Sequence, residues 1–172
     1  MANKLDPQKI VSEAIALMGE GEGLESLSLR KLAARLGVKA PSLYRHVSSK
    51  SDLFALMSAS IFRQCLARIP PCDSWENWLL EFGMSLWMEQ HRMPGTLQLI
   101  AFNRSRHSGK PPVAEDVVRM LEALGLPTAR AMVAQSSVQA LATGWTMMFP
   151  LSIEEDGAAF RASLEALIRG WR

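Results

Sequence analysis

A block of basic side chains near the N-terminus is the strongest chemical signal in this chain. Between Ser28 and Lys50 the sequence has six Lys or Arg residues and no acidic residue, whereas residues 51–172 hold 11 basic residues against 12 acidic ones. The six cations are Arg30, Lys31, Arg35, Lys39, Arg45 and Lys50. Because clustered cations attract phosphate groups, the block indicates a surface that binds nucleic acid. A charged face that is merely solvated is the alternative.

The apolar spacing around these cations predicts the two helices that must position them. The first covers 29–36, with apolar residues three and four apart on one face and Ser28 placed to cap it. Gly37 follows and can take the left-handed conformation that ends a helix. The second covers 40–47, with Pro41 in its first turn, where the missing N–H costs nothing. This is the helix-turn-helix pattern, in which the second helix reads a DNA groove.

The segment from Leu29 to Leu53 resembles the DNA-binding motif of the tetracycline-repressor family of bacterial regulators. The matching patterns are L-A-x-x-L-G-V, P-S-L-Y-x-H-V and S-K-x-x-L, without gaps, and residues 7–57 fit the family's three-helix head plus the start of its connecting helix. The resemblance implies a DNA-binding domain over 1–50 and a helical effector-binding and dimerisation domain over 51–172. It also implies a ligand-responsive regulator, most often a repressor, that binds a near-palindromic operator as a homodimer. A dimeric DNA-binding regulator without a ligand is the alternative.

Individual residues of the motif have distinct expected roles. Arg45 can form a bidentate pair with guanine, and Arg30 matches a position that contacts bases or phosphates in relatives. Lys39 stands where relatives often have a capping Ser or Thr, so it can contact a phosphate instead. Tyr44 could otherwise be a core aromatic residue, and His46 a packed imidazole. The predicted DNA-binding residues are Arg30, Lys39, Ala40, Pro41, Ser42, Tyr44, Arg45, His46 and Lys50.

The rest of the chain predicts an all-α protein of about nine helices, since no segment alternates as a strand does. Besides the two helices above, caps and breakers predict helices over 7–19, 49–69, 73–93, 96–103, 112–125, 128–149 and 152–170. Expected caps are Ser49, Asp73 with Glu76, Thr128, and Ser152 with Glu155. A cluster of Gly19, Gly21 and Gly23 should end the first helix, and an irregular basic loop is expected from Arg104 to Pro112.

The last two predicted helices carry the expected dimer interface. The helix over 128–149 is apolar around much of its girth, and such a helix needs burial on more than one side. A two-fold dimer that packs these helix pairs into a four-helix bundle would supply that burial. Packing within one subunit alone is the alternative. The predicted interface residues are Ala131, Ala134, Val138, Leu141, Trp145, Leu164, Leu167, Ile168 and Trp171.

An effector cavity is expected among the bulky apolar residues of 51–149. Ten Met residues in 172 are many, and Met side chains repack around varied shapes. The expected partner is a small hydrophobic effector, and a solid core is the alternative. The predicted effector-binding residues are Phe62, Cys65, Leu66, Phe82, Trp87, Met88, Phe102, Met120 and Trp145.

Other classes of protein have little support in the sequence. Glu89 and His91 are the nearest approach to a catalytic pair, but residues two apart lie on different helix faces. Cys65 and Cys72 have no partners at metal-binding spacing, so reduced thiols, no metal and no cofactor are expected. The first 20 residues lack the apolar core of a signal peptide, and no stretch approaches ~20 apolar residues. The expectation is a cytoplasmic protein that is neither an enzyme nor a membrane protein.

Overall fold

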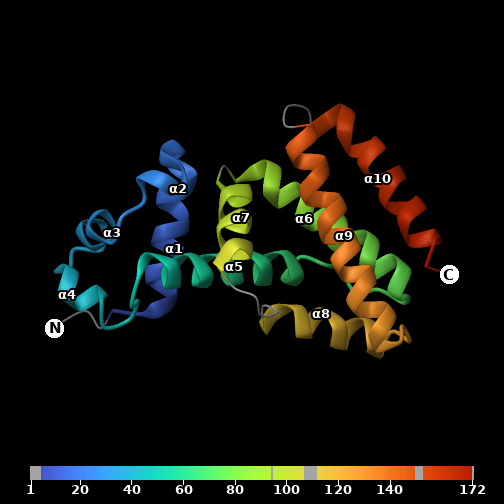
Figure 1. Ribbon diagram of the computed structural model, residues 1–172, viewed down its shortest axis with the longest axis horizontal. Helices are drawn as coiled ribbons and strands as arrows, with labels where there is room; N and C mark the ends of the chain where they lie inside the picture. The colour runs from blue at the N-terminus through green and yellow to red at the C-terminus, as the bar shows by residue number, and fades with distance from the viewer. Residues whose placement is uncertain (1–4, 94, 107–111, 150–152, 172) are drawn as a thin grey trace. The chain divides into compact units, whose positions relative to one another are not determined.

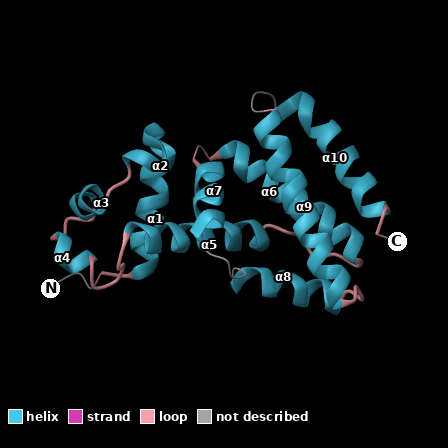
Figure 2. Cartoon of the chain, viewed as in Figure 1, coloured by secondary structure: helices cyan, strands magenta, loops and turns pink. Residues whose placement is uncertain are grey.

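The computed structural model of the chain describes residues 5–93, 95–106, 112–149 and 153–171. Within these ranges there are ten α-helices and one π-helical segment, and no strand (Figure 1, Figure 2). This confirms the all-α prediction, with one helix more than the nine expected. The chain divides into two compact units, one from 1–61 with 93–108 and the other from 62–92 with 109–172. The predicted boundary at residue 50 stays a prediction.

The first unit contains five α-helices, the π-helical segment and the N-terminal part of α5. Their bounds are α1 Pro7–Leu17, η1 Met18–Glu22, α2 Gly23–Ser26, α3 Leu29–Arg35, α4 Ala40–Leu43, α5 Lys50–Ala67 and α7 Thr96–Arg106. Its core is apolar: Ile10, Met18, Leu32 and Leu43 are fully buried. α7 is tied to this unit because the backbone N–H of Leu24 donates to Gln98 Oε1, 3.3 Å away.

The second unit contains the rest of α5 and four further helices. These are α6 Trp75–Arg92, α8 Pro112–Ala123, α9 Thr128–Met148 and α10 Ile153–Arg169. Phe82 of α6, Leu121 of α8, Val138 of α9 and Leu164 of α10 are fully buried. The four helices therefore share one hydrophobic core, which supplies most of the stability of such a bundle.

Several predicted helix ends are confirmed by their hydrogen bonds. Ser28 Oγ accepts from the backbone N–H of Lys31 at 3.2 Å, and Ser49 Oγ accepts from that of Asp52 at 3.1 Å. Gly37 has φ +67°, and the N–H of Val38 reaches back to the carbonyl of Ala33 at 3.0 Å. These hydrogen bonds satisfy backbone N–H and C=O groups that have no partner within the helix at its ends.

Four predicted features differ in the structure. The glycine cluster does not end the first helix, because the chain continues as η1 and then α2, and only Gly23 has positive φ. The second helix of the motif is α4 Ala40–Leu43, and a tighter turn carries the chain on to Val47. The basic loop begins later than expected, because α7 extends to Arg106.

The remaining difference concerns two caps. Ser74, not Asp73, accepts the backbone N–H of Asn77 at the start of α6, and Asp73 instead accepts from the side chain of Asn77. Thr128 makes no capping bond, because its hydroxyl donates to Glu122. The predicted cap at Ser152 lies outside the described residues, and nothing is described of the Glu155 side chain.

Candidate functional site

The helix-turn-helix segment presents its polar residues on one accessible face. Leu32 and Leu43 are fully buried and Val47 is 1% exposed, so these three side chains fix the inner face of α3, α4 and the following turn. The nine predicted DNA-binding residues are all exposed or half-buried: Arg30, Lys39, Ala40, Pro41, Ser42, Tyr44, Arg45, His46 and Lys50. This placement excludes a core role for Tyr44, which is 54% exposed, and a packed one for His46.

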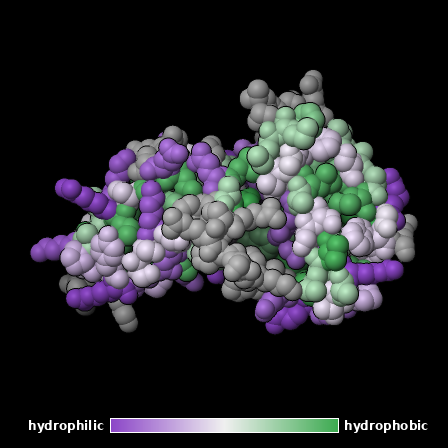
Figure 3. All heavy atoms as spheres, in the orientation of Figure 1, coloured by the Kyte–Doolittle hydropathy of each residue, from purple (hydrophilic) through white to green (hydrophobic). Residues whose placement is uncertain are grey.

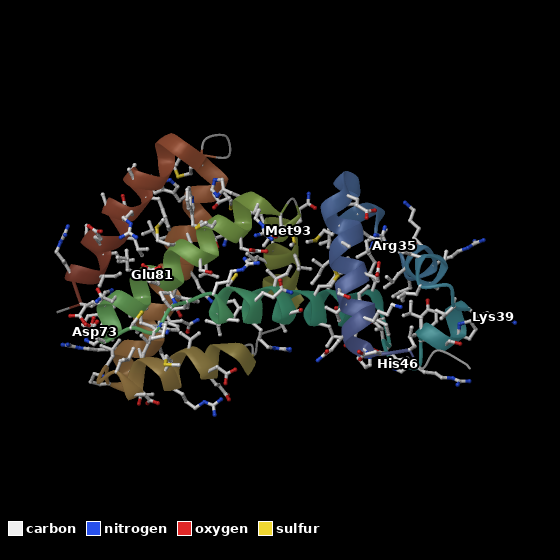
Figure 4. The ribbon with its side chains drawn as sticks, turned by 180° about the vertical axis from the view of Figure 1, so that it is seen from behind. Arg35, Lys39, His46, Asp73, Glu81 and Met93 are labelled. Carbon is white, nitrogen blue, oxygen red and sulfur yellow. The ribbon has the colours of Figure 1, made fainter. Side chains whose placement is uncertain are left out.

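Arg35 has a different role from the other cations of the block. Its Nε donates to Glu13 Oε2 at 2.9 Å, and its two terminal nitrogens donate to the carboxylate of Glu20 at 2.7 and 2.6 Å. Hydrogen bonds to Glu20 first, and then to Glu13, raise the pKa of the guanidinium. In Figure 4, Arg35 lies where α3 meets α1, whereas Lys39 lies beside α4. Arg35 therefore joins α3 to α1 and η1, which fixes the position of the motif.

The start of α5 is fixed next to the motif. Asp52 Oδ2 accepts from the backbone N–H of Ser48 at 2.9 Å and from its hydroxyl at 3.0 Å, so Ser48, Ser49 and Asp52 form a reciprocal cap. Lys50 Nζ donates to the carbonyl of Glu25 at 3.3 Å and lies 5.3 Å from the ring centroid of Phe54. The ammonium group is therefore held at the first turn of α5, while the residue stays exposed.

An apolar cavity of about 380 Å³ lies in the second unit. It falls within the size range of small-molecule sites, and Asp116 is the one Asp, Glu, Lys or Arg residue of its wall. The lining comes from the C-terminal end of α5, the loop after it, the start of α6 and α8. The lining residues are Leu66, Ile69, Pro70, Pro71, Cys72, Trp78, Asp116, Met120 and Leu124.

Only part of the predicted effector set lines this cavity, namely Leu66 and Met120. Phe62 and Phe82 contact each other edge to face at 5.7 Å, and Cys65 is buried. Met88 is 56% exposed, so it lies outside the core. Nothing is described of the Phe102 side chain. Sequence reasoning missed Trp78, Cys72 and Leu124, although the Pro70–Pro71 pair marks the place where α5 must end beside them.

Trp87 and Trp145 belong to a separate ring cluster. Both rings pack on Phe160 of α10, at centroid distances of 5.3 and 5.7 Å. His91 lies 4.6 Å from the Trp87 ring, and its Nδ1 is 3.0 Å from the carbonyl of Trp87. These aromatic residues join α6, α9 and α10, so their evident role is to hold the three helices together.

The predicted dimer residues divide into two groups. Ala131, Ala134, Val138, Leu164 and Ile168 are buried in the chain's own core, whereas Leu141, Trp145, Leu167 and Trp171 are half-buried. A side chain already shielded from solvent has no surface left for a partner, so the first five are corrected to core residues. α9 nevertheless exposes Val133 by 51% and Met147 by 68%. Figure 3 shows apolar residues gathered over α9 and α10 on this face.

No group of three His, Cys, Asp or Glu side chains in the described ranges is arranged to hold a metal ion. No helix in the same ranges is long and apolar enough to cross a bilayer.

Burial raises the pKa of the Cys65 thiol to about 11, and burial with the nearby charges of Glu81 and Asp73 raises that of Cys72. Neither thiol therefore has the character of a reactive thiolate at neutral pH.

Comparison with known proteins gives consistent matches. Residues 10–57 match the family model for bacterial regulatory proteins of the tetR family. An HTH-type transcriptional regulator of Saccharopolyspora erythraea is 28% identical over 165 residues, which cover 96% of this chain and 70% of that protein. Tetracycline repressor protein class E of Escherichia coli is 36% identical over 84 residues, which are 48% of this chain but only 39% of that repressor.

The fold of a solved structure also matches. A crystal structure of a TetR variant from Acinetobacter baumannii AYE, in complex with minocycline, has a TM-score of 0.76 and 28% sequence identity to this chain. The alignment covers 98% of this chain and 97% of that one. The likeness therefore extends through the helices that follow the helix-turn-helix motif as well as the motif itself.

Proposed function

We propose that the chain is a transcriptional regulator of the TetR family and, within that family, a ligand-responsive repressor of the bacterial cytoplasm. It binds a near-palindromic DNA operator as a homodimer, and a small, largely apolar effector releases it. The operator contacts are the nine exposed or half-buried residues of the helix-turn-helix face. Relatives named as tetracycline repressors, and a solved relative that holds minocycline, support a response to small molecules.

The proposal rests on one observation, namely where the two ends of α5 lie. This single helix begins at Lys50, beside the DNA-binding face, and ends at Ala67, where Leu66 lines the apolar cavity. A helix is stiff over 18 residues, so a displacement at one end is felt at the other. α5 therefore supplies a physical route by which a molecule in the cavity can act on the DNA-binding residues.

In a dimer, DNA binding is sensitive to small displacements of α5. Two recognition segments must reach half-sites one helical turn apart, about 34–36 Å. A ligand that prefers a different tilt of α5 would change that separation and shift the population away from the DNA-binding state. Coupling of about 1–3 kcal/mol between two sites is typical and would weaken operator binding roughly 5- to 150-fold.

The first test is an effector screen with the full-length protein. Aromatic and aliphatic compounds would be screened for thermal stabilisation, and the hits tested on a duplex selected by the protein from random-sequence DNA. Compounds that fill the cavity should raise Tm and also lower operator affinity by roughly 5- to 150-fold. A Leu124→Trp variant, which reduces the cavity, should lose both effects. Hits that stabilise the protein through the cavity but leave DNA affinity unchanged would contradict the proposed mechanism.

The second test concerns the dimer. Ala140 of α9 and Ala166 of α10 are exposed, so an acidic residue at either position costs the subunit little. In a two-fold interface it would face dry apolar surface and a like charge, and Ala140→Glu and Ala166→Glu should weaken association by about 100-fold or more. Sedimentation measures the change, with Ala123→Glu on α8 as the control that stays dimeric. Intact dimers for both variants would place the interface elsewhere.

A further inference from the structure

Glu89 is the most deeply buried acidic residue among those described. Its residue exposure is 1%, and it lies near the C-terminal end of α6. One carboxylate oxygen, Oε2, accepts from Arg68 Nη1, while the other, Oε1, is buried and has no hydrogen-bond partner in the described part of the chain. An unpaired buried oxygen on a charged group is costly, so this carboxylate has unused capacity for a donor.

The two partners of this ion pair differ sharply in exposure. The Glu89 side chain is 2% exposed, whereas that of Arg68 is 43% exposed. Arg68 could leave the pair and be hydrated at little cost, because 43% of its side chain already meets solvent. Glu89 has no such route, since removing its partner would leave a buried charge without compensation. The carboxylate therefore needs a cation, but the cation need not be Arg68.

Arg68 is also flanked in sequence by residues of the cavity wall. It follows the last turn of α5, and its neighbours Leu66 and Ile69 both line the cavity. The carbonyl of Cys65 accepts from the backbone N–H of Arg68 at 3.2 Å and from Ser85 Oγ of α6 at 3.0 Å. The charge of Glu89 contributes, after burial, to the raised pKa of the Cys65 thiol. The ion pair thus joins the end of α5 to α6, and the residues that line the cavity lie on both sides of Arg68 in sequence.

We infer that the effector is a lipophilic cation, with an apolar body for the cavity and one positively charged nitrogen that replaces Arg68 on Glu89. The exchange replaces one cation by another: the N–H group of the effector donates to the carboxylate of Glu89, and the guanidinium of Arg68 moves into water. The net charge beside Glu89 is therefore unchanged. No bond is made or broken other than hydrogen bonds. The same exchange releases the contact between Arg68 and α6, so binding would free the end of α5. This inference rests on the proposed function and specifies the chemistry of its ligand.

Matched probes separate charge from apolar bulk. The probes are 2-naphthylmethylamine and 4-phenylbutylamine, both ammonium ions at pH 7, and the corresponding alcohols, 2-naphthylmethanol and 4-phenylbutanol. Calorimetry with the full-length protein should show that at least one amine binds roughly tenfold or more tightly than its alcohol, as expected for a charge-assisted hydrogen bond. The same amine should weaken operator binding at the concentrations at which it occupies the protein.

Variants assign that preference to the ion pair. Glu89→Gln keeps the size of the side chain and should reduce the amine-to-alcohol ratio to about one, whereas Glu81→Gln, the same change at a half-exposed position of α6, should leave it unchanged. Arg68→Met removes the competing cation and should raise amine affinity by about tenfold. Should Glu89→Gln fail to fold, the Arg68→Met result still decides the matter.

Three outcomes overturn the inference. These are amines that bind no better than their alcohols, a preference that survives in Glu89→Gln, and an Arg68→Met variant with unchanged or lower amine affinity. Each of these leaves the proposed function standing if neutral compounds fill the cavity and release the operator. If no compound of either kind affects operator binding, the proposed ligand response itself fails.

Discussion

Replacement of Arg45 by alanine is expected to lower operator affinity by about 30-fold to 10⁴-fold in the homodimer. A bidentate arginine–guanine pair contributes about 1–3 kcal/mol of discrimination, and a dimer would lose one pair in each half-site. Arg45 lies in the exposed turn that follows α4, and the neighbouring Leu43 is fully buried, so the subunit should keep its stability. Competition binding with duplexes substituted at each position would show loss of preference at one base pair per half-site.

Lys50→Ala is the matched comparison for Arg45→Ala. If the ammonium contacts phosphate, its loss weakens binding to all sequences alike and flattens the dependence of log K on log salt by roughly one unit per subunit. A Lys50→Ala variant with wild-type salt dependence would remove this residue from the DNA-binding set. Equal effects of Arg45→Ala on every sequence would instead make Arg45 a phosphate contact.

Gly83→Val is expected to lower the free energy of unfolding by roughly 3 kcal/mol or more, or Tm by about 6–12 °C. A Cβ atom at position 83 would overlap Leu164 Cδ2 and lie 3.0 Å from Val138 Cγ1. Both neighbours are fully buried, so neither can swing into solvent. The glycine therefore allows α9 and α10 to pack closely against α6 at this point, and thermal unfolding at fixed protein concentration measures its importance.

A compensating change gives the sharper test of this contact. Leu164→Ala alone creates a cavity and should cost about 2–5 kcal/mol, but the double variant with Gly83→Val should lose less than the sum of the two. Gly19 is exposed with no atom within 4 Å of an added Cβ, so Gly19→Val should change stability by only about 0.5 kcal/mol. Additive losses in the double variant would show that the two side chains do not compete for one space.

The sequence predicts the fold well wherever a local signal determines a helix end. Ser28, Gly37 and Ser49 stand at such ends, and each works through hydrogen bonds or a backbone conformation set by a few adjacent residues. The alternation of buried and exposed positions in 28–50 is similarly local, so the accessible face of the motif could be predicted residue by residue. The prediction from the glycine cluster at 19–23 was wrong because glycine allows a helix to end but does not require it to end.

The second unit was harder to predict because its contacts depend on how distant helices pack. The stripe that contains Val138 and Leu164 has the spacing of an interface, but periodicity alone does not say whether the partner is α6 or a second subunit. Glu89 shows the same limit for polar residues. Its sequence neighbours reveal neither its burial nor its pairing with Arg68, which is 21 residues away.

The binding of Arg35 by Glu13 and Glu20 has a consequence for how the protein first meets DNA. It places two carboxylates and a neutralised guanidinium on the α1 and η1 side of the motif, opposite in charge to the cations around α4. An approaching duplex is therefore attracted by the cations around α4 but not by the side of the motif that carries the carboxylates of Glu13 and Glu20. Such gradients act mainly on association rates, because they rotate a partner into register before any contact forms.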